Sequence, residues 1–214
     1  MSLDVQMVTV GAIAENCFVV RREGSGSAIV VDPGDEPDKI LAAIEEMGAK
    51  VDAILLTHCH FDHIGAVKPV ATVTGAPVYC PRIETPVLAD IMSYVPIPGI
   101  GPFESYEADE TVSGGETLER AGMTIDVIHT PGHSPGHVTY SVRDEEAMFS
   151  GDVLFQGSVG RVDLPGGDGP TLMRSIRALV ESHPPETGVY PGHMGVTTLG
   201  AERASNPFLA ELAR

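Results

Sequence analysis

The sequence predicts an α/β fold in which two mixed β-sheets pack face to face with helices on both outer sides, a four-layer αββα sandwich. Each half of the chain opens with strand-like segments and closes with a segment whose apolar residues recur at helical spacing. A helix with one apolar face covers one side of a sheet, so two such halves bury the most apolar surface when their sheets meet. No stretch between the halves is long enough to be a linker, so we expect a single domain over residues 1–214.

Four strands and a helix are expected before residue 57. Alternating or continuous apolar runs predict strands at Leu3–Val10, Asn16–Arg22, Ala28–Asp32 and Val51–Leu56. Between the last two strands, four apolar side chains recur at helical spacing and Gly48 is a suitable C-cap, which predicts a helix over Glu36–Gly48. These side chains are Ile40, Leu41, Ile44 and Met47.

The next segment is expected to be a helix over Asp62–Thr74 followed by a short strand at Ala76–Cys80. Residues 81–109 then carry five prolines and are expected to form an irregular loop. Such a loop acts either as a wall or lid over a substrate or as a cover for the core, and the sequence leaves both open. Its apolar side chains are expected to be exposed: Ile91, Met92, Tyr94, Ile97 and Ile100.

The second half is expected to repeat this order. Strands are predicted at Glu116–Arg120, Met123–His129, His137–Val142, Ala147–Phe149 and Gly188–Tyr190. A glycine-rich loop, Gly157–Gly169, precedes a helix predicted over Pro170–Ser182, and the tail Leu199–Leu212 is expected to form one or two short helices.

Composition excludes several classes of function. The formal net charge of −17 disfavours a nucleic acid or an anionic membrane as partner, because an acidic surface repels phosphate groups. No apolar stretch approaches the roughly 20 residues of a membrane helix, and the first residues lack the pattern of a secretory signal. Three cysteines without a C-x-x-C pair suggest a reducing compartment, so we expect the cytoplasm. The oligomeric state is not readable from the sequence.

The segment Thr57–Gly65 holds three histidines and an aspartate within six residues, directly after the predicted strand Val51–Leu56. In open α/β folds, ligands bind beyond the carboxyl ends of strands. Clustered imidazoles and a carboxylate are costly to bury unless they bind a divalent cation. A surface loop that is merely rich in histidine is the alternative, and it is disfavoured because the whole chain has only eight histidines. The clustered residues are His58, His60, Asp62 and His63.

Three more polar residues also follow predicted strands and stand beside glycines, which let the backbone turn tightly: His133, Asp152 and His193. With the first cluster they make seven nitrogen or oxygen donors. Seven exceed the needs of one tetrahedral ion and suit two ions that share a carboxylate.

The motif His58-x-His60-x-Asp62-His63, followed in order by His133, Asp152 and His193, resembles the metallo-β-lactamase superfamily of metallohydrolases over essentially the whole chain. Within it, the loop Gly160-Arg161-Val162-Asp163 and the late segment Thr197–Leu209 are most similar to short glyoxalase II-like thioester hydrolases. The resemblance implies that His58, His60 and His133 hold one metal, that Asp62, His63 and His193 hold another, and that Asp152 bridges them. It also implies that Asp32 supports the ligand loops and that Arg161 contacts the substrate.

The function implied by the resemblance is hydrolysis of an acyl thiol of the hydroxyacylglutathione type. Two divalent ions, zinc by default with iron or manganese as alternatives, would lower the pKa of a bridging water, and the hydroxide would attack the thioester carbonyl. Asp62 and Asp152 would thereby be catalytic residues as well as ligands. Glyoxalase II enzymes continue into a helical domain that binds glutathione, whereas 21 residues follow His193 here, which leaves glutathione specificity open.

The same residues leave other functions open. A mononuclear non-heme iron persulfide dioxygenase of the same superfamily would use His58, His133 and Asp152 as a facial triad. A non-enzymatic metal-binding module is disfavoured by the complete donor set, and β-lactamase activity is disfavoured by the carboxylate of Asp152. Arg161 could instead pair with a surface carboxylate, and His129 and His137, four residues on either side of His133, need not face the metals.

Overall fold

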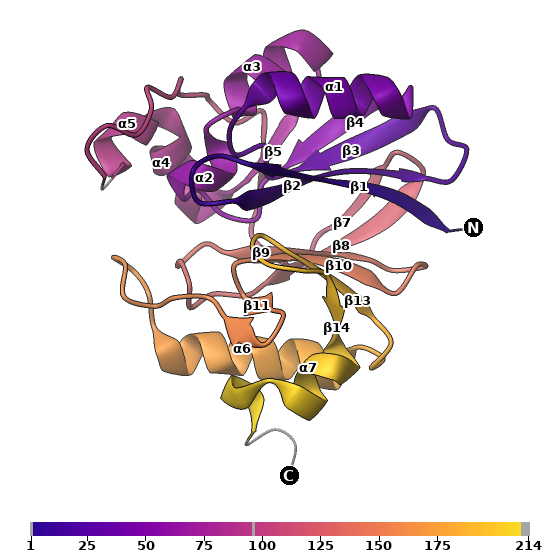
Figure 1. Cartoon of the computed structure of the whole chain (residues 1–214), viewed down its shortest axis with the longest axis vertical. Coiled ribbons are helices and arrows are strands. Elements are labelled where there is room, and N and C mark those ends of the chain that lie inside the picture. The colour runs from indigo at the N-terminus through magenta and orange to yellow at the C-terminus, as the bar shows by residue number, and fades with distance from the viewer. Residues whose placement is uncertain (1, 96, 211–214) are drawn as a thin grey trace.

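The computed structural model describes residues 2–95 and 97–210. Two six-stranded mixed sheets face each other, and helices cover the outer side of each sheet (Figure 1). The predicted αββα sandwich is therefore confirmed. Among the described residues, no helix combines the length and the apolar character needed to cross a membrane.

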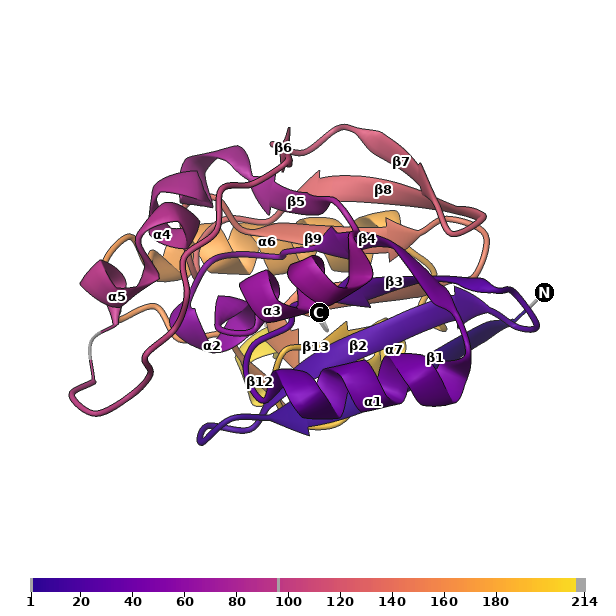
Figure 2. The same cartoon turned by 90° about the horizontal axis from the view of Figure 1, so that it is seen from above.

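The first sheet contains the N-terminal strands in sequence order. Its strands are β1 (Leu3–Val10), β2 (Glu15–Arg22), β3 (Ser27–Val31), β4 (Lys50–Leu55), β5 (Val78–Pro81) and β6 (Glu110–Val112). Strands β1 to β3 are antiparallel and β3 to β6 are parallel. Helices α1 (Pro37–Met47) and α3 (Val67–Thr74) lie over the outer face of this sheet (Figure 2).

The second sheet is built from the C-terminal half. In spatial order its strands are β14 (Thr197–Thr198), β13 (Gly188–Pro191), β10 (Ala147–Gly151), β9 (Val138–Val142), β8 (Met123–His129) and β7 (Thr117–Arg120). Only the pair β10/β13 is parallel within the described part of this sheet. Its outer face is covered by α6 (Gly169–Ser182), α7 (Leu199–Ser205) and η2 (Pro207–Leu209). A small hairpin of β11 (Leu154–Phe155) and β12 (Ser158–Val159) lies between β10 and α6 in sequence.

Three apolar layers hold the sandwich together. Successive side chains of a strand point to opposite faces, so β3 places Val30 among the side chains under α1 and α3 and Ile29 among those between the sheets. The central layer joins aromatic side chains of both sheets, such as Phe18 and Phe149, whose ring centroids are 5.4 Å apart. In the third layer, Leu172 of α6 packs against the second sheet. Both sheets are thus covered on both faces, as the predicted layers require.

The helix expected over Asp62–Thr74 is wrong as a single element. It is divided into α2 (Phe61–Ile64) and α3 because the N–H of Ala66 donates to the carbonyl oxygen of Pro33 at 3.0 Å, outside any helix. At Gly65 a Cβ would come within 2.4 Å of the Gly34 carbonyl oxygen, so this close approach needs glycine.

The expectation of an irregular loop over residues 81–109 is wrong for its first part. That part contains η1 (Arg82–Glu84), α4 (Thr85–Ala89) and α5 (Ile91–Tyr94), and Pro86 occupies the first turn of α4, where proline is tolerated. Ile91 is buried, although Met92, Tyr94 and Ile97 are exposed as expected. Strands β6, β11, β12 and β14 were not predicted because two or three residues carry no periodic pattern. The end of the tail helix expected to reach Leu212 lies outside the described residues.

Candidate metal centre

Four loops, each at the carboxyl end of a strand, bring the seven predicted donors together at one edge of the sandwich. The cluster from residues 57–65 follows β4, and His133 lies in the loop after β8. Asp152 follows β10 and His193 follows β13, and because these two strands are parallel neighbours their carboxyl ends meet. Segments far apart in the sequence therefore supply one site.

The first donor group consists of three imidazole nitrogens that face one another. The distance is 3.1 Å between His58 Nε2 and His60 Nδ1, 2.8 Å between His60 Nδ1 and His133 Nε2, and 3.2 Å between His133 Nε2 and His58 Nε2. Each nitrogen either carries a proton or offers a lone pair, so three of them cannot all pair as donor and acceptor. Tetrahedral zinc with Zn–N bonds of about 2.0–2.1 Å separates its nitrogens by about 3.3 Å. The group has the composition and spacing of a cation site.

The second donor group contains Asp62, His63 and His193. Asp62 Oδ2 is 3.2 Å from His193 Nε2 and 3.6 Å from His63 Nε2. Asp152 lies between the two groups. Its Oδ1 is 3.3 Å from His63 Nε2, and its Oδ2 is 3.4 Å from His133 Nε2 and 3.6 Å from His193 Nε2. One carboxylate therefore faces donors of both groups.

Two of these atoms are buried without a partner. His63 Nε2 and Asp152 Oδ1 make no hydrogen bond within the described part of the chain, although almost all buried polar atoms in proteins do. A divalent cation accepts a lone pair from each of them. The donor set therefore fits metal ions.

Asp32 fixes the tautomers of two histidines from behind. Its Oδ2 accepts hydrogen bonds from Thr57 Oγ1 at 2.6 Å and from His63 Nδ1 at 3.0 Å. Because the Thr57 hydroxyl proton points to Asp32, Thr57 Oγ1 accepts from His58 Nδ1 at 3.1 Å. Both rings then carry their proton on Nδ1 and offer the Nε2 lone pair to the site. Atoms of Asp32, His58 and His63 also lie close enough together to hold an ion. Asp32, however, contacts Nδ1 of His63, whereas the other donors face its Nε2.

Backbone carbonyls fix two further tautomers. His133 Nδ1 donates to the Arg161 carbonyl oxygen at 2.8 Å, and His193 Nδ1 donates to the Ala14 carbonyl oxygen at 3.3 Å. A carbonyl oxygen only accepts, so both rings keep the Nε2 lone pair free. Four of the five histidines are thus oriented by a second contact on their far nitrogen.

The side chain of Arg161 is directed to a neighbouring carboxylate. Its Nε and Nη2 donate to the two oxygens of Asp163 at 2.7 and 2.8 Å, and both side chains are exposed. The residue therefore touches the donor group through its backbone carbonyl. The exposed guanidinium retains N–H groups that this pairing leaves unused.

His137, which the sequence did not assign to the site, lies directly behind the donors. Its Nε2 accepts the backbone N–H of Asp152 at 3.1 Å, and its Nδ1 donates to Thr130 Oγ1 at 3.0 Å. The buried ring also stacks on His58 with centroids 4.9 Å apart. The repeated Pro-Gly-His of residues 131–137 was the available signal, because the second copy brings another imidazole to the same loop.

Glu15 is a second residue that sequence reasoning missed. Its carboxyl is buried 3.7 Å from His63 Nδ1, and neither oxygen has a hydrogen-bond partner among the described residues. Burial raises the pKa of this carboxyl well above its usual range. No sequence pattern marks it, since it is an ordinary first residue of β2. Cys59 points away from the donors, with its Sγ 3.5 Å from that of Cys80.

The electrostatics of the site separate neutral from charged rings. Burial, together with the neighbouring imidazoles, lowers the pKa of His60 to about 4 and that of His58 well below its usual range. Burial opposes the charged form of His63 too, but Asp152 and Asp62 outweigh it and raise its pKa. Burial likewise opposes ionisation of Asp152, yet His63 and His133 hold the pKa of its carboxyl far below the usual range. His58 and His60 are therefore neutral at neutral pH, whereas the carboxyls of Asp62 and Asp152 are ionised.

The site is closely packed on one side and partly exposed on the other. A Cβ at Gly192 would lie 2.5 Å from Asp152 Oδ1 and 2.6 Å from His63 Cε1, so only glycine fits there. His58, His63 and His133 are buried, whereas Asp62 and His193 are partly exposed. The centre is therefore open to solvent at His60, Asp62 and His193.

The family model described as Metallo-beta-lactamase superfamily matches residues 10–193, which include all seven donors. The chain belongs to the metallo-beta-lactamase superfamily. Members of this superfamily are mostly metal-dependent hydrolases. One relative is hydroxyacylglutathione hydrolase GloC of Haemophilus influenzae, 32% identical over 97% of this chain and 98% of that protein.

Two solved structures share the fold over almost their whole length. The crystal structure of BLEG-1 B3 metallo-beta-lactamase has a TM-score of 0.91 and 38% identity, covering 97% of this chain and 100% of that one. The crystal structure of TTHA1623 in a di-iron-bound form has a TM-score of 0.84 and 42% identity, covering 96% of this chain and 100% of that one.

Proposed function

We propose that this chain is a two-metal hydrolase of thioesters. The observation that carries the proposal is the placement of one carboxylate, that of Asp152, between two groups of three donors. His58, His60 and His133 would hold one divalent ion and Asp62, His63 and His193 the other. Zinc is the first expectation, and iron or manganese would also suit these ligands. The di-iron form of TTHA1623 supports two ions at such a site.

When bound, two divalent ions supply Lewis acidity toward a carbonyl and lower the pKa of a nearby water. The chain itself contributes a fixed geometry. Asp62, on the open side of the centre, is placed to orient the attacking water and accept its proton through Oδ2. A thiolate is a good leaving group, so the chain needs no dedicated acid for it. The N–H groups of Arg161 that Asp163 leaves unused would hydrogen-bond the substrate.

The similarity to GloC supports the choice of a thioester, since that relative is named as a hydroxyacylglutathione hydrolase. The three cysteines are all unpaired thiols, in keeping with the expectation of a cytoplasmic protein.

Elemental analysis of chelator-free protein, coupled to hydrolysis assays, tests the proposal. We expect two metal ions per chain and hydrolysis of thioesters above the rates for a β-lactam and a lactone. His58→Ala and Asp152→Ala should lose metal and nearly all activity. His129→Ala is the matched control, because this exposed histidine belongs to neither donor group and, among the described residues, its ring hydrogen-bonds the Pro135 carbonyl oxygen alone. Full metal content and activity in Asp152→Ala would refute the assignment. Faster hydrolysis of the β-lactam than of the thioesters would instead indicate the activity for which BLEG-1 is named.

A mononuclear iron persulfide dioxygenase is the second candidate. The observation in its favour is that His133 Nε2 lies 3.2 Å from His58 Nε2 and 3.4 Å from Asp152 Oδ2, which suits a facial triad. One iron per chain with oxygen consumption on glutathione persulfide, and no thioester hydrolysis, would establish this candidate in place of the hydrolase.

A further inference from the structure

We propose that the thiol carrier of the substrate is an uncharged group that extends along the narrow crevice beside Asp62 into the larger cavity next to it, and that anionic carriers such as glutathione are selected against. This inference rests on the proposed thioester hydrolysis and adds the class of carrier. It follows from the position of the crevice, from its apolar walls and from the charges around it.

The crevice adjoins the open side of the donor cluster. Asp62 lines it directly, and its other walls are the turn between β1 and β2, helix α2 and the segment before β6. Its apolar side chains are Ile13, Phe61, Ile100 and Phe103. The rings of Phe61 and Phe103 stack with centroids 6.1 Å apart. A substrate whose carbonyl reaches the centre from this side must place part of its remaining atoms against this wall.

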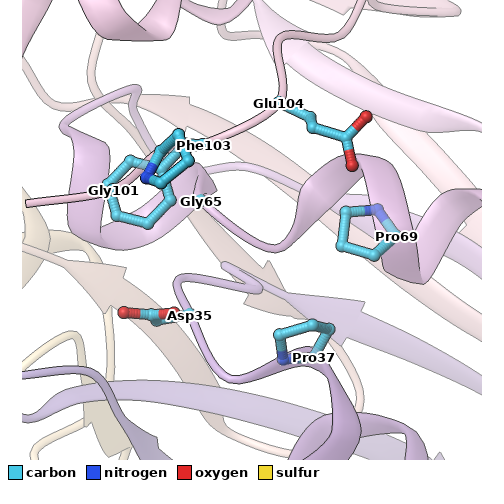
Figure 3. Close-up of a pocket in the computed structure, with 8 residues that line it drawn as sticks. Asp35, Pro37, Gly65, Pro69, Gly101, Phe103 and Glu104 are labelled. Carbon is cyan, nitrogen blue, oxygen red and sulfur yellow. The ribbon is translucent and has the colours of Figure 1, made fainter.

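A larger cavity lies next to the crevice. It has a volume of about 340 Å³, and Asp35 and Phe103 line both spaces. Figure 3 shows the carboxylates of Asp35 and Glu104 on opposite sides of this cavity, with Pro37 and Pro69 between them on one flank. Cavities of this size hold small organic ligands. In a thioester of a small acyl group the carrier is the larger part, so the cavity suits the carrier.

The charges that line both spaces are negative. Asp35 contributes a carboxylate that forms no ion pair among the described residues, whereas Glu104 is paired with Lys68 and Asp62 is a proposed metal ligand. No lysine or arginine lines either space within the described residues. The Asp35 side chain also lies against Gly11, where a Cβ would be 3.3 Å from Oδ2. A carboxylate of the substrate seated here would meet repulsion and no compensating cation.

The cations of the surrounding elements are already paired. Lys39 on α1 is 2.8 Å from Glu36, and Lys68 on α3 is 3.0 Å from Glu104. The guanidinium of Arg161 is held by Asp163. Each pair is close to neutral, so an anionic carrier would have to displace an existing carboxylate before gaining an ion pair.

The reaction is balanced without a co-reactant. The water oxygen forms a bond to the acyl carbon, the carbon–sulfur bond breaks, and its electron pair leaves on sulfur. One water proton passes by way of the Asp62 carboxylate to the thiolate, and the other goes to solvent. A thioester and water thus give a carboxylate, a proton and a free thiol.

Three thioesters of the same lactoyl group separate carrier charge from carrier size in the metal-loaded enzyme: those of glutathione, of N-acetylglutathione diethyl ester, which carries no charge, and of N-acetylcysteamine. We expect kcat/KM for the diethyl ester to exceed that for glutathione by at least about tenfold, because the two carriers have the same peptide skeleton and differ in their charged groups. Added salt should narrow this gap. Equal or faster hydrolysis of the glutathione thioester would overturn the inference and leave the proposed function intact. Hydrolysis of none of the three would refute the proposed function itself.

Asp35→Asn tests whether the thiol carrier lies beside Asp35. The amide oxygen can still accept the N–H of Glu36, which Asp35 Oδ1 accepts at 2.7 Å, while one negative charge is removed. We expect the ratio of kcat/KM for the glutathione thioester to that for the diethyl ester to rise severalfold. Asp144→Asn is the control, because this exposed carboxylate pairs with Arg22 outside the crevice and should leave the ratio unchanged. An unchanged ratio in Asp35→Asn would show that the carrier lies elsewhere.

Discussion

The imidazole of His137 accepts a hydrogen bond at Nε2 from the backbone N–H of Asp152, with 3.1 Å between the two nitrogens. Because Nε2 accepts, the ring is neutral and its proton is on Nδ1, where it donates to Thr130 Oγ1. Burial lowers the pKa of His137 well below its usual value, in agreement with this neutral form. A histidine outside both donor groups therefore fixes the residue that lies between them.

His137→Leu should weaken metal binding and destabilise the fold. It leaves the Asp152 N–H buried without an acceptor, which costs about 1–3 kcal/mol in free energy of unfolding, and loss of a supporting contact lowers metal affinity by roughly 10–100-fold. His137→Gln offers an amide oxygen near the position of Nε2 and should retain most of both. Urea unfolding and competition with a fluorescent zinc chelator measure the two effects. Equal affinity in the Leu variant and the natural protein would remove the supporting role.

Asp32→Asn should weaken both donor groups at once. Asp32 accepts three hydrogen bonds, from Thr57 N, Thr57 Oγ1 and His63 Nδ1, and an asparagine amide cannot accept all three. The tautomers of His58 and His63 are then no longer fixed, so we expect a loss of roughly 10–100-fold in metal affinity. Chelator competition measures it, with Asp144→Asn as the charge-matched control. A loss of affinity for only one of two bound ions would show that the hydrogen bonds from His58 to Thr57 and from Thr57 to Asp32 are not needed.

The metal-free protein should lose stability as the pH falls from about 6.5 toward 4. Burial lowers the pKa of His60 to about 4, so below the unfolded value of about 6.5 the unfolded state binds a proton that the folded state does not. His60 alone then removes up to about 3 kcal/mol across this window. His58 and His137 act in the same direction.

His63 and His193, whose pKa values are raised, act in the opposite direction, because they stabilise the fold at low pH and lose that contribution as the pH rises. Comparing the natural protein with His60→Gln therefore isolates the contribution of His60 to the pH dependence, because His63 and His193 are present in both. Urea unfolding in the presence of chelator at pH 7, 5.5 and 4.5 should show a shallower decline in this variant. Parallel curves for the two proteins would contradict the neutral state of His60.

Arg161→Ala should separate the backbone role of this residue from that of its side chain. The backbone carbonyl holds His133 Nδ1, and the substitution preserves it, so metal affinity should change less than about twofold. If the guanidinium contacts the substrate as proposed, KM for thioesters should rise with little change in kcat. Steady-state kinetics and chelator competition give the two readouts. An unchanged KM would assign the side chain to its exposed ion pair with Asp163.

Periodic patterns predicted most of the large helices and strands, because each of these elements has one or two apolar faces. Strand β4 and helices α1 and α6 lie within one or two residues of their expected bounds. The break at Gly65 and the burial of Ile91 were not predictable, since both depend on contacts with segments far along the chain. Local pattern also gave no sign of Glu15, whose importance lies only in its distance to His63.

The sequence by itself determined which seven side chains stand at the ends of strands and in what order, because that information is local to each motif. The tertiary structure decided which nitrogen of each ring faces the site. That choice depends on acceptors such as the Ala14 carbonyl, 179 residues from His193, and the Arg161 carbonyl, 28 residues from His133. The proton follows the acceptor, and only the folded chain brings the acceptor to the ring.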